Sequence, residues 1–219
     1  QVDGILFDLG ISSYQVDSGY KGLSYKDDSP LDMQLGIEDG ITVKQLLKTS
    51  SEEEIANIIY NNSEERGSRR IAKSIMNYVK KNKMDTNQDL VRAVDEVVPK
   101  RFLNKTLSRV FQAFRIKVNN ELENIVYSVS EAIHLLKPGG RLAIISFHSI
   151  EDRLIKNIFK DFSKEDSSLI ENMGYNFSFK CKKIIKLITK KPISSSWSQI
   201  KNNKRARSAK LRVAERLHE

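Results

Sequence analysis

The fold class follows from the stretch Val2-Asp3-Gly4-Ile5-Leu6-Phe7-Asp8-Leu9-Gly10. Its apolar run ends in an acid and a glycine, which is the pattern of a short buried strand that leads into a turn. A second apolar run, residues 141–147, follows a long helical pattern and the helix stop Pro138-Gly139-Gly140. A helix that leads into a strand at this spacing predicts an α/β fold, in which ligands bind beyond the carboxyl ends of the strands.

Residues 42–99, between these two strands, show helical spacing throughout. Ser51 and Glu54 form a capping-box pattern, and Pro99 ends the last helical segment. No strand candidate interrupts these residues, so we expect a small all-α subdomain inserted into the α/β fold. Residues 11–33 are rich in Ser, Gly and Asp and contain three tyrosines, which predicts an ordered functional loop.

The same periodicities predict the remaining elements. One long helix is expected from Phe111 to Leu136, because its apolar residues recur close to the 3.6-residue helical period. Residues 151–162 predict another helix, and residues 183–189 and 208–214 predict two further strands.

Composition narrows the class of protein. With 219 residues and 39% hydrophobic content, the chain fits one globular domain with an insertion. No apolar run approaches the roughly 20 residues of a membrane span and no signal peptide opens the sequence, so we expect no membrane and a cytoplasmic location. The single Cys181 has no Cys or His neighbour at metal-ligand spacing, so neither a disulfide nor a metal is expected. The chain opens at Gln1 and enters a strand within two residues, so we expect a part of a longer polypeptide.

The net charge of +9 is concentrated near the C-terminus. Residues 180–219 hold 13 Lys and Arg against Glu215 and Glu219, a net charge of +11, which leaves −2 for the preceding 179 residues. A basic segment of this kind is the footprint of a polyanion-binding surface or a solvated tail that aids solubility. Charge alone favours neither.

Polar side chains cluster just after each of the first two predicted strands. They lie in residues 8–13 and in residues 148–153. Both clusters fall where ligands bind in open α/β sheets. A structural explanation exists for each, because Asp8 could cap a turn, and Glu151 and Asp152 could complement a helix N-terminus.

Six blocks in this order resemble the MraW family of ribosomal RNA small subunit methyltransferases. The blocks are Asp3–Met33, Glu64–Ala72, Phe111–Glu123, Pro138–Leu142, Ile145–Arg153 and Asn203–Arg212. The resemblance implies a Rossmann-like class I methyltransferase fold that uses S-adenosyl-L-methionine. Residues 1–41 and 109–219 would form the Rossmann-like domain, and residues 42–108 the inserted helical RNA-recognition subdomain.

The resemblance also implies an activity, which is N4-methylation of a cytidine in the decoding region of 16S rRNA. In this family the acid of the Asp-Leu-Gly stretch and a glutamine seven residues later contact the cofactor, which assigns that role to Asp8 and Gln15. A Gly-Gly-His cofactor loop, also typical of the family, has no counterpart in residues 1–219. We therefore expect the Rossmann-like sheet to be incomplete at its N-terminus and the 219-residue chain alone to be inactive.

The chemistry of the amine predicts a catalytic set. A cytosine amine is a poor nucleophile, so an enzyme must align it with the methyl group and accept a hydrogen bond as positive charge develops. We expect Asp8, Ser12 and Ser13 to flank the amine, with His148 and Glu151 completing the pocket. The alternative for His148 is a packed histidine at the end of a strand.

The expected partner is 16S rRNA or the small ribosomal subunit, and a homodimer is compatible with the sequence. Arg205, Arg207, Lys210 and Arg212 are candidates for phosphate contacts. Trp197 could stack on a base, although a buried tryptophan that anchors a loop explains it equally well. The competing function is a catalytically inactive ribosome- or RNA-binding module of the same fold, which would lack a Gly-Gly-His segment altogether.

Overall fold

The computed structural model describes residues 1–17, 20–36, 40–165, 170–172, 175–177 and 183–217. The chain divides into two compact units. The sheet unit comprises Gln1–Gly10 and Leu122–Glu219, and the helical unit comprises Ile11–Glu121. Cys181 lies outside the described residues. No helix in the described part of the chain is both long and apolar enough to cross a membrane.

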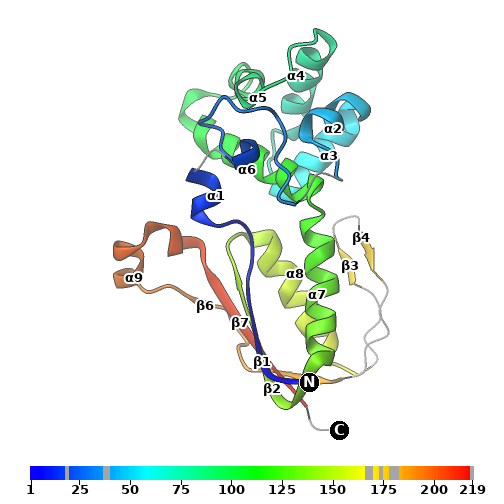
Figure 1. The fold of residues 1–219 in the computed structure, drawn as a ribbon, viewed down its shortest axis with the longest axis vertical. Coiled ribbons are helices and arrows are strands. Elements are labelled where there is room, and N and C mark those ends of the chain that lie inside the picture. The colour runs from blue at the N-terminus through cyan, green and yellow to red at the C-terminus, as the bar shows by residue number, and fades with distance from the viewer. Residues whose placement is uncertain (18–19, 37–39, 166–169, 173–174, 178–182, 218–219) are drawn as a thin grey trace. The chain divides into compact units, whose positions relative to one another are not determined.

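The sheet unit is built on a mixed sheet whose strands run in the order β1 (Val2–Asp8), β2 (Leu136–Ser146), β7 (Lys210–Arg216) and β5 (Ile185–Leu187). The short β6 (Ile193–Ser194) also pairs with β7. Strands β1 and β2 are parallel, whereas β7 is antiparallel to β2, β5 and β6. This sheet and its helices confirm the expected Rossmann-like α/β class (Figure 1).

Two helices complete the core of the sheet unit. They are α7 (Glu121–Leu135), which precedes β2, and α8 (Ser149–Phe162), which follows it. Along β2, the fully buried Leu142 and Ile144 alternate with the half-buried Ala143 and Ile145, as expected of a strand with one well-covered face. Helix α8 contacts β2, β7 and β5, so its apolar stripe covers this part of the sheet.

The helical unit confirms the predicted run of helices. Its elements are α1 (Ser13–Asp17), η1 (Tyr20–Gly22), α2 (Val43–Thr49), α3 (Glu52–Ser63), α4 (Ser68–Lys80), α5 (Asn87–Asp95), η2 (Lys100–Phe102) and α6 (Leu103–Val118). The predicted capping box at Ser51 and Glu54 is present at the start of α3. Helix α5 begins directly after Thr86, as the apolar pattern predicts, but it ends at Asp95, before Pro99.

The loop before α2 packs into the helical core, so the compact units divide at different places from the expected domain boundaries. Leu31 and Met33 are almost completely buried there. The fully buried Asn87 donates hydrogen bonds to the backbone oxygens of Gly22 (2.9 Å) and Ser24 (2.8 Å). The two compact units accordingly divide after residues 10 and 121, whereas the expected domains divide after residues 41 and 108.

The prediction of one helix from Phe111 to Leu136 is wrong. Helix α6 ends at Val118, and α7 begins at Glu121. Asn120 between them has a φ of 48°, in the left-handed region that asparagine tolerates better than most residues. The apolar spacing from Val118 to Leu122 continues across this break, which is why periodicity did not reveal it.

The C-terminal part contains several short elements. Strands β3 (Ile170–Asn172) and β4 (Tyr175–Phe177) pair with each other, within a segment expected to be a polar connection. Helix α9 (Trp197–Asn202) and the 3₁₀ turn η3 (Lys204–Ser208) lead into β7. Strand β7 lies inside the sheet and not at its edge, which matters for the charged residues that it carries.

Candidate active site

Asp8 lies at the carboxyl end of β1, beside the carboxyl end of β2. It pairs in register with Ile145, and the next residue, Leu9, donates a backbone hydrogen bond to the Ile145 oxygen (3.1 Å). The Asp8 residue is exposed, and its carboxylate has no hydrogen-bond or ion-pair partner among the described residues. A negative acceptor is thus held at the edge of the sheet where ligands bind in such folds.

The chain turns sharply after this strand. Gly10 has a φ of 88°, a conformation that residues with a Cβ rarely adopt. A Cβ atom at this position would lie 3.9 Å from Oε1 of Glu151, so the turn passes close to the start of α8. The turn after β1 and the turn after β2 therefore lie together within the sheet unit.

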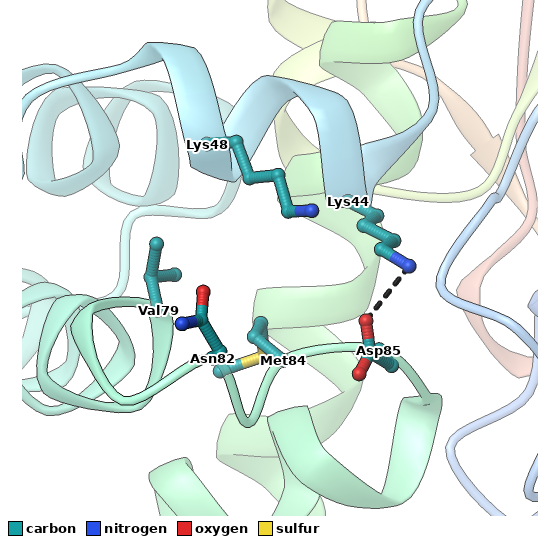
Figure 2. Close-up of a pocket in the computed structure, with 6 residues that line it drawn as sticks. All are labelled: Lys44, Lys48, Val79, Asn82, Met84 and Asp85. Atoms are coloured by element: carbon teal, nitrogen blue, oxygen red, sulfur yellow. Dashed lines mark ion pairs between the residues drawn. The ribbon is translucent and has the colours of Figure 1, made fainter.

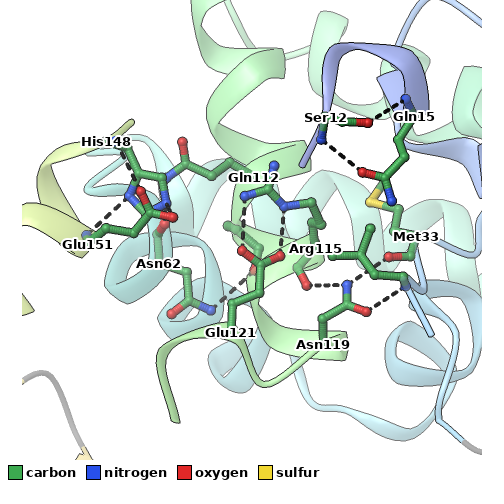
Figure 3. Close-up of polar contacts among 12 residues, drawn as sticks. Ser12, Gln15, Met33, Asn62, Gln112, Arg115, Asn119, Glu121, His148 and Glu151 are labelled. Carbon is green, nitrogen blue, oxygen red and sulfur yellow. Dashed lines mark hydrogen bonds and ion pairs between the residues drawn. The ribbon is translucent and has the colours of Figure 1, made fainter. Parts of the chain in front are cut away.

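His148 and Glu151 form a reciprocal cap at the start of α8 (Figure 3). The backbone nitrogen of Glu151 donates to Nδ1 of His148 (3.3 Å). Oε2 of Glu151 accepts from the backbone nitrogens of Phe147 (2.9 Å) and His148 (3.3 Å). Glu151 is 1% exposed, so its carboxylate holds the turn after β2 instead of facing solvent.

Nε2, the second ring nitrogen of His148, takes no part in this cap. It lies 3.1 Å from Oε1 of Glu151, within ion-pair distance, but the two atoms are not aligned as a hydrogen bond. The atom is buried and has no hydrogen-bond partner among the described residues. His148 is consequently a packed, capping histidine whose second ring nitrogen faces Glu151.

Ser12 and Gln15 form a similar cap at the start of α1, in the helical unit (Figure 3). The Ser12 nitrogen donates to Oε1 of Gln15 (2.8 Å), and the Gln15 nitrogen donates to Oγ of Ser12 (3.2 Å). Ser13 is the first residue of α1. The structure therefore brings Asp8, His148 and Glu151 together in one unit, and it places Ser12, Ser13 and Gln15 in the other.

Arg212 differs from its expected role as a phosphate contact. It is 6% exposed, and its guanidinium donates to both oxygens of Asp152 on α8, at 2.7 and 3.2 Å. Nζ of Lys210 also lies 3.2 Å from Asp152. The neighbour of Arg212 in the sheet is the buried Ile144 of β2, so Arg212 points to the covered face and joins β7 to α8 instead of reaching solvent.

This ion pair alters the acid–base behaviour of Asp152. Burial alone raises the pKa of the carboxyl, but the hydrogen bonds and positive charges of Arg212 and Lys210 outweigh that effect. The pKa of Asp152 is therefore below its ordinary value, and the pair stays ionised at neutral pH.

The exposed basic residues of the C-terminal part lie before β7. Arg205 and Arg207 are exposed on η3, and Arg207 has no ion-pair partner among the described residues. Trp197 at the start of α9 is 85% exposed, so it is not the buried loop anchor that the sequence allowed. These residues supply cationic and aromatic groups on one short segment.

The sequence did not predict a network of hydrogen bonds that fixes the loop before α2 to the end of α6 (Figure 3). The side chain of Asn119 donates to the backbone oxygens of Met33 and Arg115, both at 2.8 Å, and accepts from the Leu35 nitrogen (2.7 Å). Arg115 forms a two-pronged ion pair with Glu121, at 2.7 and 3.0 Å. The Asn-Asn pair between two apolar segments was the available signal.

Comparison with known proteins gives a family for this arrangement. The family model described as the MraW methylase family matches residues 1–217. The chain belongs to this family. Its relatives include a protein of Brevibacillus brevis, 44% identical over 99% of this chain and 69% of the relative. A relative from Acinetobacter baumannii is 43% identical over 100% of this chain and 69% of its own length, and one from Ehrlichia canis is 42% identical over 97% and 69%. Each is named ribosomal RNA small subunit methyltransferase H.

Membership of the MraW methylase family confirms the resemblance that the six sequence blocks indicate. It makes the chain a methylase by family, so the carboxyl ends of β1 and β2 are the candidate place for methyl transfer. In the described part of the chain, no group of three or more His, Cys, Asp or Glu is arranged to hold a metal ion.

Proposed function

We propose that this protein is an S-adenosyl-L-methionine-dependent enzyme that methylates the N4 amine of a cytidine in the decoding region of 16S rRNA. Family membership supports methyl transfer, and the names of the relatives support small-subunit rRNA as the substrate. The observation that carries the proposal is the exposed, unpartnered carboxylate of Asp8 at the carboxyl end of a parallel strand. With this substrate the protein would act in the cytoplasm.

The chemistry assigns Asp8 two tasks. A carboxylate is an acceptor only, so it suits donor groups of a cofactor and an amine that gains positive charge during attack. The backbone and hydroxyl groups of Ser12 and Ser13, four and five residues later, would flank the same amine. These roles for the serines rest on the sequence alone.

The residues present fit a cationic methyl donor. S-adenosyl-L-methionine supplies an electrophilic methyl group on a positively charged sulfur. The uncompensated charge of Asp8 favours such a ligand, and Gln15 would be the second contact. Oε1 of Gln15 accepts from the Ser12 nitrogen, so this cap would fix the orientation of the amide toward a ligand.

His148 and Glu151 would act mainly as positioning residues. Their mutual cap and the two backbone hydrogen bonds to Glu151 hold the turn after β2 in place. Nε2 of His148 is buried 3.1 Å from Oε1 of Glu151, which further fixes the ring in this turn. Preorganised groups of this kind lower the cost of aligning the reactants.

RNA binding would use the exposed basic segment. We assign phosphate contacts to Arg205 and Arg207, and structural roles to Lys210 and Arg212, which both pair with Asp152. Trp197, exposed on the same segment, is suited to stacking on an unpaired base. A homodimer remains a proposal that light scattering would check.

The proposal is tested by methyl transfer from radiolabelled S-adenosyl-L-methionine to unmethylated small ribosomal subunits. We expect Asp8→Asn in the whole protein to reduce the rate at least about a hundredfold, as loss of a key electrostatic contact does elsewhere. Asp3→Asn is the matched control, because Asp3 lies on the same strand but its carboxylate pairs with Lys137 (3.0 Å) at the surface. Full activity of Asp8→Asn would contradict the assignment.

The same assay decides between the enzyme and an inactive RNA-binding module. The second candidate, an inactive RNA-binding module of the same fold, predicts no methyl transfer by any form of the protein. We expect residues 1–219 alone to transfer no methyl group, whereas the protein encoded by the whole gene does. Turnover by residues 1–219 would contradict the first expectation, and no turnover by either would support the binding module.

A further inference from the structure

An open pocket of about 610 Å³ lies on the helical unit, between the end of α3 and the start of α4. Its volume falls within the roughly 300–1,000 Å³ range of small-molecule sites. The lining residues are Asn57, Tyr60, Arg66, Gly67, Ser68, Arg69 and Arg70. All three charged residues in the lining are therefore arginines.

These arginines are not neutralised within the protein. Arg66, Arg69 and Arg70 are exposed, and among the described residues none has a carboxylate within ion-pair distance. The acid nearest in sequence to the pocket lining, Glu65, is 8% exposed and turned inward. It accepts from the Gly67 nitrogen (3.0 Å) and from Arg109 (3.1 Å), so its charge is already used.

The uncompensated charges carry a cost that a bound anion would remove. Three guanidinium groups around one pocket repel one another. Arg69 and Arg70 also lie in the first turn of α4, where the helix dipole disfavours cations. Arginine rather than lysine suits phosphate, because its planar fork donates two parallel hydrogen bonds.

The pocket also presents groups suited to a base. Tyr60 on α3 is 55% exposed, and Asn57 lies three residues before it, on the same side of that helix. An exposed aromatic ring stacks on an unpaired base, and an amide can bond to a base edge. Cationic forks, an aromatic ring and an amide together match a nucleotide better than an acidic peptide.

We propose that this pocket binds a single-stranded segment of the RNA substrate, with phosphates on Arg66, Arg69 and Arg70 and one base on Tyr60. The inference rests on the proposed function, since it takes the substrate to be RNA. It adds a second RNA contact region to the basic segment before β7.

A second pocket on the same unit lacks these properties and provides a control. It measures about 80 Å³ and lies beside Lys44 and Lys48 of α2 (Figure 2). Lys44 pairs with Asp85 (2.7 Å), and the volume is too small for a nucleotide. A control variant can remove three positive charges outside the arginine pocket, by substitution of Lys48, Lys80 and Lys81.

The test measures binding of a fluorescent single-stranded RNA of about 12 nucleotides to the whole protein, by anisotropy and without a methyl donor. The variant Arg66→Gln, Arg69→Gln, Arg70→Gln should bind at least about tenfold more weakly at 0.1 M salt. The slope of log affinity against log salt should fall by about 2, because each phosphate contact on a single strand contributes about 0.7. The control variant Lys48→Gln, Lys80→Gln, Lys81→Gln removes the same charge and should retain most of the affinity and slope.

Two further variants test the base contact. Tyr60→Ala should weaken binding about fivefold or more, whereas Tyr60→Phe should bind as the unchanged protein does. The arginine variant should unfold at the same or a higher temperature, because it removes repulsion. Equal losses in the arginine and lysine variants, or unchanged binding in the arginine variant, would overturn the proposed site.

The failure of this inference can be separated from failure of the proposed function. Pocket-dependent RNA binding by a protein that does not methylate rRNA would leave the pocket standing and remove the enzyme. Methylation of rRNA by a protein whose RNA binding does not depend on the three arginines would leave the proposed function standing and remove the pocket. An acidic peptide that displaces the RNA only from the unchanged pocket would assign the site to a protein partner and overturn the inference.

Discussion

At the scale of single residues, the pair formed by Asp152 and Arg212 shows how a charge that looks functional is used for stability. Arg212 stands opposite Ile144 on the covered face of the sheet, where an unpaired guanidinium would be costly. Asp152 on α8 accepts two hydrogen bonds from it. The sequence places Arg212 in a basic segment, and its burial and its contact with Asp152 show that it points inward.

We therefore expect Asp152→Asn to lower the free energy of unfolding by about 3 kcal/mol at pH 7, because it leaves the buried Arg212 without its counter-ion. Urea unfolding followed by circular dichroism measures this. Asp3→Asn is a control, because its pair with Lys137 is exposed and contributes little. An equally small effect at both positions would contradict a structural role for Asp152.

The pH dependence of the same comparison has a definite sign. Since the folded state lowers the pKa of Asp152, its contribution to stability is fully present above the ordinary pKa of 3.8 and is lost as the pH falls through the lowered value. The difference between the unchanged protein and Asp152→Asn should be constant above about pH 5 and shrink below about pH 4. A difference that grows with acid would contradict the direction of the shift.

At the scale of elements, the break between α6 and α7 is the feature that hydrophobic periodicity could not reveal. Asn120 adopts a left-handed conformation, and Asn119 uses its side chain to hold the loop at Met33 and Leu35. Polar residues at two exposed or half-exposed positions do not interrupt an apolar stripe. Helix existence was predictable here, and helix continuity was not.

Substitution of Asn120 tests this account of the break. Asn120→Ala should destabilise the protein by about 1 kcal/mol, because a Cβ disfavours the left-handed conformation. Asn120→Gly should be neutral or slightly stabilising, since glycine adopts this conformation without a steric cost. Thermal unfolding of both variants measures the difference. If the Asn120→Ala variant were as stable as the Asn120→Gly variant, the left-handed conformation of Asn120 would not be what breaks the helix.

The sequence predicted where the residues of the candidate site lie, but not which of them contact one another. The position of Asp8 after one strand and of His148 and Glu151 after the next follows from the rule for ligand sites in parallel sheets. The mutual cap of His148 and Glu151 did not follow from it, because a capping histidine is uncommon and the acid could equally face a ligand. Side-chain partners depend on packing that a linear pattern does not specify.

At the scale of the whole molecule, two compact units carry different parts of the proposed work. The sheet unit holds Asp8 and the exposed basic segment, and the helical unit holds the arginine pocket. The sequence predicted both classes of unit from strand and helix periodicity. The compact units divide after residues 10 and 121, because Leu31 and Met33, within a loop rich in polar residues, are core residues of the helical unit.

The most direct test of the account is mass-spectrometric mapping of methylated cytidines in small-subunit rRNA. The comparison uses cells with the gene, cells without it, and cells in which only the Asp8→Asn variant is restored. We predict an N4-methylcytidine in the decoding region that disappears without the gene and stays absent with Asp8→Asn, although that variant protein accumulates normally. N4-methylation that is unchanged when the gene is removed would contradict the proposed function.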